Sequence, residues 1–593
     1  MTRQTPKITT RTYDSQAFES LRHGGLSSVL ARIYAARGIS NSTQLETALT
    51  RLIPFNQIRN IHLMASLLAD AIEARRRLLI IADYDSDGAT ACAVGIRILR
   101  KLGADVSYLV PNRFEYGYGL TPEIVDLAYT TFRPDIIITV DNGIASIEGV
   151  KAAKALGMQV LITDHHLPGD ELPDATAIIN PNQPGCPFPS KNIAGVGVIF
   201  YLMLALRAEF RQRSAFINNK EPNLAAFLDL VALGTVADVV RLDDNNRILV
   251  QQGLKRIQAG FACAGINALL KVAGRKAQQT STYDLGFILG PRLNAAGRLD
   301  DMSLGIECLV TDDAANAEQI ARQLDALNVR RREIESNMQD SALSKLESTL
   351  HAENAQIQSA YSVCLFDHSW HQGVIGILAS RIKDKYHRPV IIFAPGNDGE
   401  IKGSGRSIPG FHLRDALDLV SKRYPGVIVK FGGHAAAAGL TILAEHFVRF
   451  CEAFETTAQS LLTESDLTRV IETDGELVES DMNMELARQL THQVWGQGFP
   501  QPTFNACFYV VNQRLVGEKH LKLKLKKVPA NGASVSESNN ISYDAILFFH
   551  NDLLPDVISA VYRLQINEFN GRTTLQLLLE HWSQAEVITE LIS

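Results

Sequence analysis

The sequence predicts an α/β protein with a parallel-sheet domain, a long connecting helix, a second α/β domain and a C-terminal β-barrel. Three patterns lead to this prediction. Segments that are apolar almost throughout, such as LLIIA, IIITV and VLIT, alternate with amphipathic segments, as in parallel sheets covered by helices on both faces. Residues 312–350 contain neither Gly nor Pro, which favours one long helix. After residue 467, short segments of alternating hydrophobicity follow one another, which is typical of a small barrel or sandwich.

The predicted elements follow in order along the chain. Residues 1–75 have the spacing of short helices, with one buried face formed by Met64, Leu67, Leu68 and Ile72. We expect helices over residues 91–99, 121–129 and 147–156 in the first α/β domain and over 374–386 in the second. The predicted boundaries are 1–75 for the helical segment, 76–311 for the parallel-sheet domain, 312–355 for the connecting helix, 356–466 for the second α/β domain and 467–593 for the barrel.

Composition narrows the class of protein. The chain has 593 residues, of which 46% are hydrophobic and 21% charged. These ordinary values exclude a disordered, collagen-like or supercoiled rod protein. The formal net charge is −6. Any affinity for nucleic acid must therefore come from a local patch or a bound metal, because the overall field is weakly acidic.

Cysteine usage and hydropathy predict the compartment. The seven cysteines are scattered, and none forms a C-x-x-C pair, which argues against a disulfide framework and a thiolate zinc site. The first residues contain no apolar core, and no run of 18 apolar residues occurs. We therefore expect a cytoplasmic protein without an export signal or a membrane span.

Three predicted strands end in acidic residues. LLIIA leads to Asp83, IIITV to Asp141 and VLIT to Asp164. In open parallel sheets, ligands bind beyond the carboxyl ends of the strands. The sequence therefore predicts that these side chains meet in one crevice.

The first of these ends is crowded with carboxylates. Asp83, Asp85 and Asp87 occur in the segment DYDSDG, and three carboxylates this close repel one another unless a cation neutralises them. A capped, solvated turn is the alternative. An EF-hand is excluded, because Val94 stands where that calcium loop requires a glutamate.

The other polar positions add imidazole and further carboxylate groups. Asp164 precedes His165 and His166, which can face a metal ion or a phosphate. Asp238 lies in an apolar stretch, where burial without a partner would be costly, whereas Asp141 taken alone would more often cap a helix or form a turn. Carboxylates with one or two imidazoles suit Mn²⁺ or Mg²⁺. A pair of such ions about 4 Å apart can promote in-line phosphoryl displacement.

The motifs resemble those of a known superfamily. DYDSDG (83–88), VDNG (140–143), DHH (164–166) and ADVV (237–240) are similar to the four ordered motifs of the DHH phosphoesterases. Five further segments resemble the RecJ branch, the single-strand-specific exonucleases: 111–120, 290–301, 371–381, 403–411 and 431–439.

This resemblance implies 5′→3′ degradation of single-stranded DNA to mononucleotides, with two Mn²⁺ or Mg²⁺ ions in a DHH catalytic domain. Other branches begin the first motif with a histidine where Ile81 stands here, so the assignment of each acid to one ion stays open. The resemblance also implies that His166 contacts the scissile phosphate and that Asp164 orients the side chain of His166. The implied metal ligands are Asp83, Asp85, Asp87, Asp141, His165 and Asp238.

Substrate contacts are expected in three further places. Ser404 and Arg406 lie in GSGRS, which we expect to be a Gly-flanked loop that can hold a terminal phosphate; the resemblance implies that it binds the 5′ end. A hairpin turn with a solvated arginine is the alternative. A second Gly-rich segment is similar to GSGRS, with tight packing around a structural histidine as the alternative. A set of polar residues among apolar or small ones has the pattern of phosphate contacts, with surface salt bridges as the alternative. These residues are Gly432, Gly433 and His434, and then Arg113, Arg292, Asn294 and Arg298.

The C-terminal region carries a basic strand. Lys522, Lys524 and Lys526 alternate with leucines, so they project from one face. A lysine-protected edge strand is one interpretation. The other is an OB-like barrel that follows the phosphate backbone and stacks bases. The residues invoked for it are Lys519, Lys522 and Lys524, with Phe504, Phe508, Tyr509 and His520 as aromatic neighbours.

These expectations combine into one hypothesis. The active site is expected in a cleft between the two α/β domains, narrow enough to exclude a duplex, with the barrel extending the path of the DNA. The resemblance also implies work in DNA repair and recombination beside single-strand-binding protein and a helicase. Two alternatives stay open: a DHH phosphatase or nuclease acting on short oligonucleotides, and a non-catalytic single-strand-binding scaffold.

Overall fold

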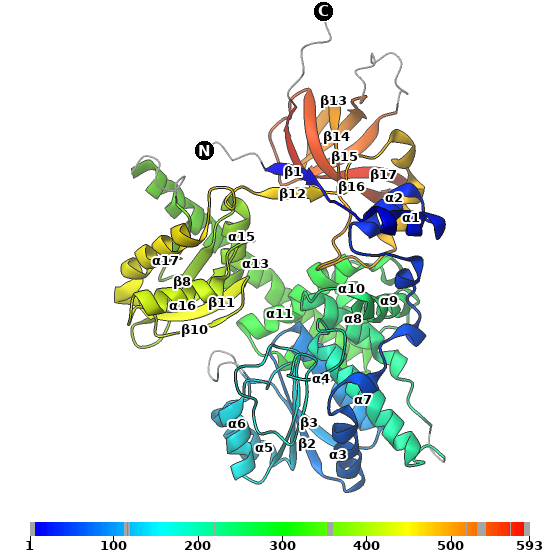
Figure 1. Ribbon diagram of the computed structural model, residues 1–593, viewed down its shortest axis with the longest axis vertical. Coiled ribbons are helices and arrows are strands. Elements are labelled where there is room, and N and C mark those ends of the chain that lie inside the picture. Colours follow the sequence, from blue (N-terminus) through cyan, green and yellow to red (C-terminus); the bar gives the residue numbers. More distant parts are fainter. Residues whose placement is uncertain are drawn as a thin grey trace, which may run out of the picture. The chain divides into compact units, whose positions relative to one another are not determined.

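The computed structural model describes residues 6–111, 116, 119–217, 220–352, 360–517, 519–529, 541–569 and 571–585 (Figure 1). Of these, residues 347–352 and 569 are described by their backbone alone. The chain divides into two compact units, which are described separately. One contains Met1–Ile8 with Ala326–Ile471, and the other contains Thr9–Asp325 with Glu472–Ser593.

The larger unit contains a parallel sheet with the strand order β3-β2-β4-β5-β6. Its central strands are apolar almost throughout, as expected of strands that helices cover on both faces. Helices α5 and α6 cover one face, whereas α3, α4 and α7 cover the other (Figure 1). The strands are β2 (Arg77–Ala82), β3 (Asp105–Leu109), β4 (Ile136–Val140), β5 (Gln159–Thr163) and β6 (Ala177–Ile179). The helices are α3 (Ile61–Glu73), α4 (Ser86–Lys101), α5 (Pro122–Phe132), α6 (Ile147–Ala155) and α7 (Gly195–Gln212).

A layer of helices extends this domain beyond α4. Helix α8 is apolar on all sides and is buried from Leu228 to Thr235, as expected of a helix inside a larger core. It packs against α4, α7 and α9. The layer contains α8 (Leu228–Ala237), α9 (Asp244–Gln258), α10 (Ala264–Val272), the π-helix η6 (Asp284–Leu289), α11 (Gly290–Leu299) and α12 (Ser303–Val310).

Two sequence predictions need correction here. The helix expected over 91–99 begins at Ser86, because Asp85 from the acidic motif accepts hydrogen bonds from its first turn. Residues 1–75 do contain α1 (Ser15–His23), α2 (Ser28–Ala35) and α3, but helices alone were the wrong expectation for their beginning. Strand β1 (Lys7–Thr10) pairs instead with β12 (Val470–Thr473). That partner is too distant in sequence to be inferred from local periodicity.

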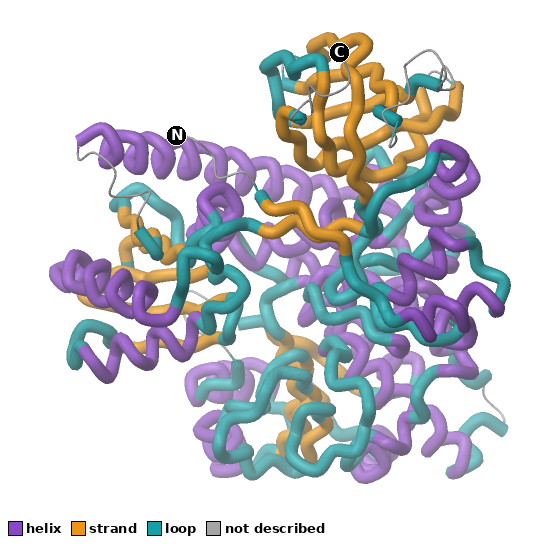
Figure 2. The backbone as a smooth tube through the Cα atoms, turned by 45° about the horizontal axis from the view of Figure 1, so that its top comes forward, coloured by secondary structure: helices purple, strands orange, loops and turns teal. Residues whose placement is uncertain are grey.

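The C-terminal part of the same unit is a closed five-stranded barrel with the order β13-β14-β15-β17-β16. The predicted barrel is therefore confirmed, and its strand number matches that of an OB fold. The strands form the orange group at the top of Figure 2. They are β13 (Phe504–Val516), β14 (His520–Lys527), β15 (Tyr543–Phe548), β16 (Val557–Phe569) and β17 (Arg572–Gln584), next to the helix α18 (Met484–Thr491).

A buried ion pair holds the N-terminal helices to the segment that leads into the barrel. Asp474 accepts two hydrogen bonds from Arg37, at 2.6 and 3.0 Å, and one from Arg11 at 3.2 Å. The Arg37 guanidinium also lies 5.3 Å from the Trp495 ring centroid. Arg37 and Asp474 have side chains that are 1% and 0% exposed, so neither charge has water as an alternative partner.

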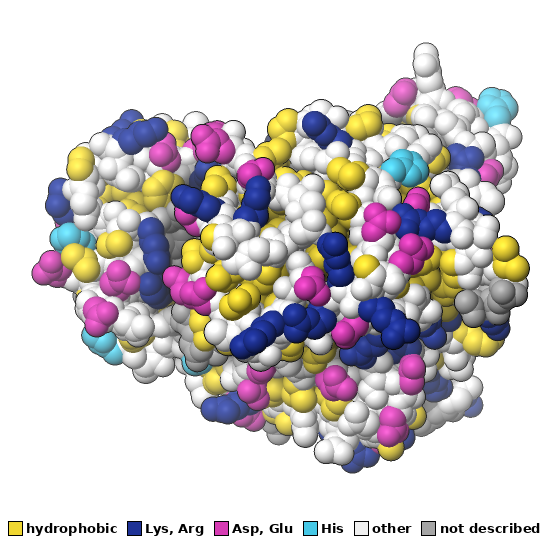
Figure 3. Space-filling view, turned by 90° about the horizontal axis from the view of Figure 1, so that it is seen from below, with side chains coloured by type: hydrophobic (Ala, Val, Ile, Leu, Met, Phe, Trp, Pro, Cys, Tyr) yellow, Lys and Arg dark blue, Asp and Glu magenta, His cyan; other side chains and the backbone are white. Residues whose placement is uncertain are grey.

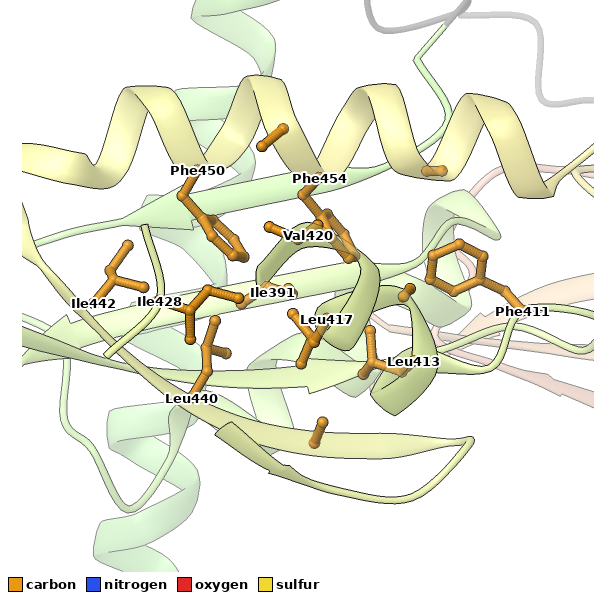
Figure 4. Packing of buried hydrophobic residues seen from close by; sticks show 14 of the residues in the cluster. Ile391, Phe411, Leu413, Leu417, Val420, Ile428, Leu440, Ile442, Phe450 and Phe454 are labelled. Atoms are coloured by element: carbon orange, nitrogen blue, oxygen red, sulfur yellow. The ribbon is translucent and has the colours of Figure 1, made fainter. Parts of the chain in front are cut away.

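The other unit contains a mixed sheet with the order β10-β11-β9-β8-β7, in which only β7 and β8 run parallel. Phe450 and Phe454 point from α17 toward the sheet and α16, and they pack with Ile391 and Leu417 (Figure 4). The elements are β7 (Val363–Phe366), α15 (Ile375–Tyr386), β8 (Val390–Pro395), β9 (Glu400–Arg406), α16 (Leu413–Arg423), β10 (Lys430–Gly433), β11 (Ala437–Leu443) and α17 (Phe447–Leu461).

The predicted long helix is confirmed as α13 (Ala314–Ala352). Its residues Met338, Ala342 and Leu346 pack on α15 within the smaller unit. Among the described helices, none combines the length and the hydropathy needed to cross a membrane. On the face drawn in Figure 3, acidic and basic side chains are interspersed, in agreement with the small net charge.

Replacing Asp474 with alanine should destabilise the larger unit by about 3–5 kcal/mol, because it leaves the Arg37 charge buried without its partner. Urea denaturation followed by tryptophan fluorescence would measure this change, since Trp495 lies beside Arg37. Glu472→Ala is the matched control. Glu472 also pairs with Arg11 but is 60% exposed, so its loss should cost about 1 kcal/mol or less. Equal effects of the two substitutions would contradict the assigned role of Asp474.

Candidate metal centre

The carboxyl ends of three neighbouring strands bring the predicted acidic residues together. Ala82 of β2 pairs with Val140 of β4, and Val140 pairs with Thr163 of β5. The next residue of each strand is an aspartate: Asp83, Asp141 and Asp164. Because the strands are parallel and in register, these residues emerge side by side at one edge of the sheet.

Four separate segments contribute to one cluster. His165 places its Nε2 3.0 Å from Asp141 Oδ1, 3.5 Å from Asp238 Oδ2 and 3.9 Å from Asp87 Oδ2. The cluster contains three sets of ligand atoms, and within each set the atoms lie within 4.8 Å of one another. Each set could therefore hold one cation. The sets are Asp83 with Asp85 and Asp141, Asp87 with His165 and Asp238, and Asp141 with His165 and His166.

Asp87 is held by the N-terminus of α7. Its Oδ2 accepts a hydrogen bond from Gly195 N at 2.6 Å, and its Oδ1 accepts one from Val196 N at 2.9 Å. The positive end of the helix dipole stabilises a carboxylate at this position. Asp85 in turn caps α4 by accepting hydrogen bonds from Asp87 N and Gly88 N. The first motif is therefore fixed by two helix termini.

Asp141 has an unusual backbone and a tight environment. Its φ angle is +62°, a left-handed conformation that is uncommon outside glycine. A Cβ atom on Gly195 would lie 2.6 Å from Asp141 Cβ and 2.7 Å from its Oδ1. The next residue, Asn142, donates to Ile81 O and Val140 O and thereby joins β2 to β4. The glycine and the asparagine together fix this carboxylate.

Asp238 comes from the end of α8, which packs directly on the first motif. A Cβ atom on Gly234 would lie 2.1 Å from Thr90 Oγ1 and 2.9 Å from Asp87 Oδ1. Only glycine allows α8 and α4 to approach this closely. This approach brings Asp238, the residue that ends α8, into the cluster.

Asp164 orients both histidines. It accepts hydrogen bonds from His165 N at 2.7 Å, from Ile144 N at 2.9 Å and from the His166 ring Nδ1 at 2.7 Å. Although burial alone lowers the pKa of His166, this bond and the surrounding carboxylates raise it to about 9. His166 is therefore a cation at neutral pH.

The pKa values of the buried carboxyl groups show the cost of gathering them. Burial, followed by the charge of Asp85, raises the pKa of Asp87 to about 7. Burial and the neighbouring acids raise the pKa of Asp141 and of Asp238 well above the ordinary value. Burial and the charge of His166 lower the pKa of His165 to about 4, which leaves its imidazole neutral and able to bind a metal.

The cluster fits a hard divalent cation. His165 Nε2 and Asp238 Oδ2 are buried, and neither atom makes a hydrogen bond to any described residue. Buried polar atoms normally have partners, so their state suggests a ligand. Carboxylate oxygens with imidazole nitrogen match Mn²⁺ or Mg²⁺. The three sets of ligand atoms contain the six residues expected from the sequence and also His166.

The other residues of the larger unit that were predicted to contact the substrate differ in their surroundings. Asn294 Oδ1 accepts hydrogen bonds from Ser86 N and Oγ at 2.7 and 2.9 Å, which fixes the first motif. Arg292 donates to Ile288 O and pairs with Asp325 at 2.9 Å, so the salt-bridge alternative describes it. Arg298 lies half-buried on α11. Arg113 lies outside the described residues.

The predicted terminal-phosphate residues belong to the smaller unit. GSGRS was expected to be a Gly-flanked loop, but Ser404 and Arg406 lie on β9, because this strand pairs with both β8 and β11. Arg406 donates to Ser404 Oγ and Gly405 O, and burial lowers its pKa. Residues Gly432, Gly433 and His434 lie in the β10–β11 hairpin, and β11 is the neighbour of β9. The structure thus brings these five residues to one end of the sheet.

The barrel residues divide between the surface and the core. Leu521, Leu523 and Leu525 are buried, whereas Lys519 and Lys524 are exposed and Lys522 is half-buried, as the alternation predicted. The prediction that Phe504 and Phe508 stack on bases is wrong, because both are fully buried in the barrel. Lys527 also points inward and pairs with Glu476 at 2.8 Å.

Several positioning residues escaped the sequence analysis. Asn180 donates to His166 O and Asn182 donates to His165 O, at 2.9 and 2.6 Å. They follow the short strand β6 in the segment NPNQPG, whose turn residues could have been a signal. Gly195 and Gly234 carried no such signal, because only the packing of α7 and α8 shows their importance.

Substituting Gly195 with alanine should reduce Mn²⁺ affinity by at least about tenfold, because the added methyl group displaces the Asp141 carboxylate. Isothermal titration calorimetry would measure the change. Gly169→Ala is the control: Gly169 is exposed, and the nearest atom to its added Cβ would be 3.9 Å away. Wild-type affinity in the Gly195 variant would contradict the proposed ligand role of Asp141.

The stability of the metal-free protein should fall as pH rises from about 4 to about 7. The folded state retains a proton on Asp87 up to about pH 7, and the raised pKa values of Asp141 and Asp238 act in the same direction, whereas the unfolded chain releases these protons near the ordinary carboxyl value. The lowered pKa of His165 offsets one of these protons, because above about pH 4 the unfolded chain holds a proton on this imidazole that the folded state has released. Each such proton changes the free energy of unfolding by about 1.4 kcal/mol per pH unit.

Urea denaturation in a chelator at several pH values would check this prediction. Asp87→Asn should reduce the dependence of the free energy of unfolding on pH by the contribution of one proton. Added Mn²⁺ should make this free energy rise with pH instead of fall, because the metal competes with protons for the carboxylates. An unchanged slope in the Asp87 variant would show that this carboxyl group does not hold the proton.

Three family descriptions match the chain in order. Residues 77–235 match the DHH family N-terminal domain, residues 356–460 the DHHA1 domain and residues 473–581 the RecJ OB domain. Single-stranded-DNA-specific exonuclease RecJ of Dickeya dadantii is 48% identical over 560 residues, which cover 94% of this chain and 96% of that protein. The protein of the same name from Escherichia coli is also 48% identical, over 557 residues covering 93% and 95%.

A solved structure supports the same relationship. The crystal structure of RecJ from Thermus thermophilus in complex with Mn²⁺ has a TM-score of 0.80 and 27% sequence identity. The match covers 98% of this chain and 80% of that chain. A second structure of that protein, in complex with Mg²⁺, has a TM-score of 0.73 and covers 98% and 78%. This chain therefore belongs to the RecJ family of DHH phosphoesterases.

Proposed function

We propose that this protein is a metal-dependent exonuclease that degrades single-stranded DNA to mononucleotides in the 5′→3′ direction. The observation that carries the proposal is the convergence of four residues from separate segments: Asp87, Asp141, His165 and Asp238. Each belongs to at least one set of ligand atoms that lie within 4.8 Å of one another. The relatives named single-stranded-DNA-specific exonuclease cover nearly the whole chain. The resemblance adds the polarity, the products and a role in DNA repair and recombination.

The residues take the following roles in this proposal. The ligands of the two ions are Asp83, Asp85, Asp87, Asp141, His165 and Asp238. When bound, Mn²⁺ or Mg²⁺ supplies the positive charge that activates water and stabilises the reacting phosphate. His166 contacts the scissile phosphate, and Asp164 holds its ring. Burial keeps the His165 imidazole neutral, so no proton competes for its Nε2.

Substrate binding uses groups outside the metal centre. Arg406 and Ser404, with Gly432, Gly433 and His434, would receive the 5′-phosphate, because a buried guanidinium forms strong charge-assisted hydrogen bonds with phosphate. Lys519, Lys522 and Lys524 would follow the DNA backbone along the barrel. Arg113 and Arg298 would contribute phosphate contacts. The intramolecular bonds of Arg292 and Asn294 support positioning roles for these two residues.

The proposal also includes the cellular setting. A single-stranded substrate is exposed where a helicase has separated a duplex, and there it is covered by single-strand-binding protein. We therefore expect both proteins as partners, and we expect this chain to act in the cytoplasm. Co-purification with each tagged partner would test these expectations.

Digestion of 5′-labelled and 3′-labelled single strands with Mn²⁺ tests the proposal. The 5′ label should leave first as a mononucleotide, and a blunt duplex should stay intact. Release of the 3′ label first would overturn the polarity. Hydrolysis of a dinucleotide without hydrolysis of the long strand would favour an oligonucleotide phosphatase, and no release of nucleotide would favour a binding scaffold.

Asp141→Ala should reduce cleavage to background, because Asp141 belongs to two of the three sets of ligand atoms. Its affinity for single-stranded DNA, measured by fluorescence anisotropy in Ca²⁺, should remain measurable. Asp170→Ala is the control, since Asp170 is an exposed acid four residues after His166 and should retain wild-type turnover. Normal turnover by the Asp141 variant would remove the proposed metal centre.

A further inference from the structure

Two aromatic side chains are stacked on each other at the surface of the larger unit. Tyr283 is 54% exposed and Phe287 is 70% exposed. Their ring centroids are 5.1 Å apart and their planes differ by 26°. Single exposed apolar residues are common, but two stacked rings that are both exposed offer an outer ring face on which a further ring can stack.

The backbone beneath the pair is also unusual. Phe287 lies in η6, a π-helix that continues directly into α11. Such segments are rare and occur frequently at functional sites. Asp284 fixes the start of this segment by accepting hydrogen bonds from Ser281 N and Oγ at 2.9 Å. The start of the backbone segment that carries the two rings is therefore fixed.

The same segment lies beside the metal centre. A Cβ atom on Gly286 would be 3.2 Å from Val236 Cγ1, and one on Gly290 would be 3.2 Å from Ala237 Cβ. Val236 and Ala237 directly precede Asp238, the candidate metal ligand. The helix that carries the pair thus packs on the last turn of α8.

The turn that precedes this segment contacts the barrel. Gln279, four residues before Tyr283, donates to Glu568 on β16 at 2.9 Å. Exposed Arg275 and Lys276 lie just before it. One Arg275 nitrogen is 3.5 Å from Asp284, whereas Lys276 adds a further positive charge. Along the chain, the aromatic pair therefore lies between a residue that contacts the barrel and glycines that pack next to the metal centre, and two basic residues precede it.

We propose that Tyr283 and Phe287 form a platform on which bases of the single-stranded substrate stack as the strand passes between the barrel and the metal centre. This inference rests on the proposed nuclease function. Aromatic faces next to basic side chains are the general means of holding single strands without reading their sequence, because every base has a π-face. A duplex has its bases already stacked on each other, so it gains nothing from such a platform.

A scan with abasic sites tests the platform directly. Single strands that each carry two adjacent abasic positions, moved stepwise from the 5′ end, are bound to the full-length protein in Ca²⁺ and followed by fluorescence anisotropy. The wild-type protein should lose about tenfold in affinity when the abasic sites reach the platform. The double variant Tyr283→Ala with Phe287→Ala should bind the intact strand about tenfold more weakly and lose this position-dependent minimum.

Two variants serve as controls. Tyr283→Phe with Phe287→Tyr retains both rings and should retain the wild-type profile. Tyr129→Ala removes a 40% exposed ring from α5 and should also retain it.

Three results would overturn the platform: a wild-type profile without a sensitive position, a double variant with the wild-type profile, or a change of oligomeric state in the double variant, which would indicate a contact between two copies. Failure of the wild-type protein to release nucleotides from a single strand would instead reject the proposed function.

Discussion

Electrostatic repulsion among buried carboxylates is the constraint on which this structure depends. Asp87, Asp141 and Asp238 lie in a region with little water, where burial and mutual repulsion raise their pKa values. The fold offsets part of this cost with the backbone amides at the start of α7. The remainder is left for cations. A site arranged in this way is at its least stable when it is empty and ionised, which favours tight binding of metal.

The crowding of buried carboxylates explains why glycines and asparagines surround the metal centre. Gly195 leaves room for the Asp141 carboxylate, and Gly234 leaves room for Asp87 and Thr90. Asn142, Asn180 and Asn182 bond to backbone carbonyls, so that the loops that carry the ligands keep one conformation. The two glycines have no side-chain ligand atom, and the three asparagines use their amide nitrogens to hold the backbone. Their contribution is geometric, because a binuclear site tolerates only small displacements of its oxygens.

Much of this arrangement could be predicted from the sequence, because its signals are local. Apolar strands that end in Asp83, Asp141 and Asp164 indicate both the parallel sheet and the polar edge, and the long helix and the barrel follow from periodicity. The errors arose where a distant partner decides the outcome. Ser404 and Arg406 lie on a strand that two neighbours complete, Phe508 is turned inward by closure of the barrel, and strand β1 has its partner near residue 470.

The pairing of β1 with β12 also bears on how the chain is synthesised and folded. Arg11 and Asp474, at the ends of these strands, are separated by 463 positions. Because β1 is synthesised before β12, it stays without this partner until the residues between them have been translated. Contacts across such a separation close slowly, because the intervening chain must be ordered first. We infer that the parallel-sheet domain assembles early during translation and that docking of the N-terminal strand is among the last steps of maturation.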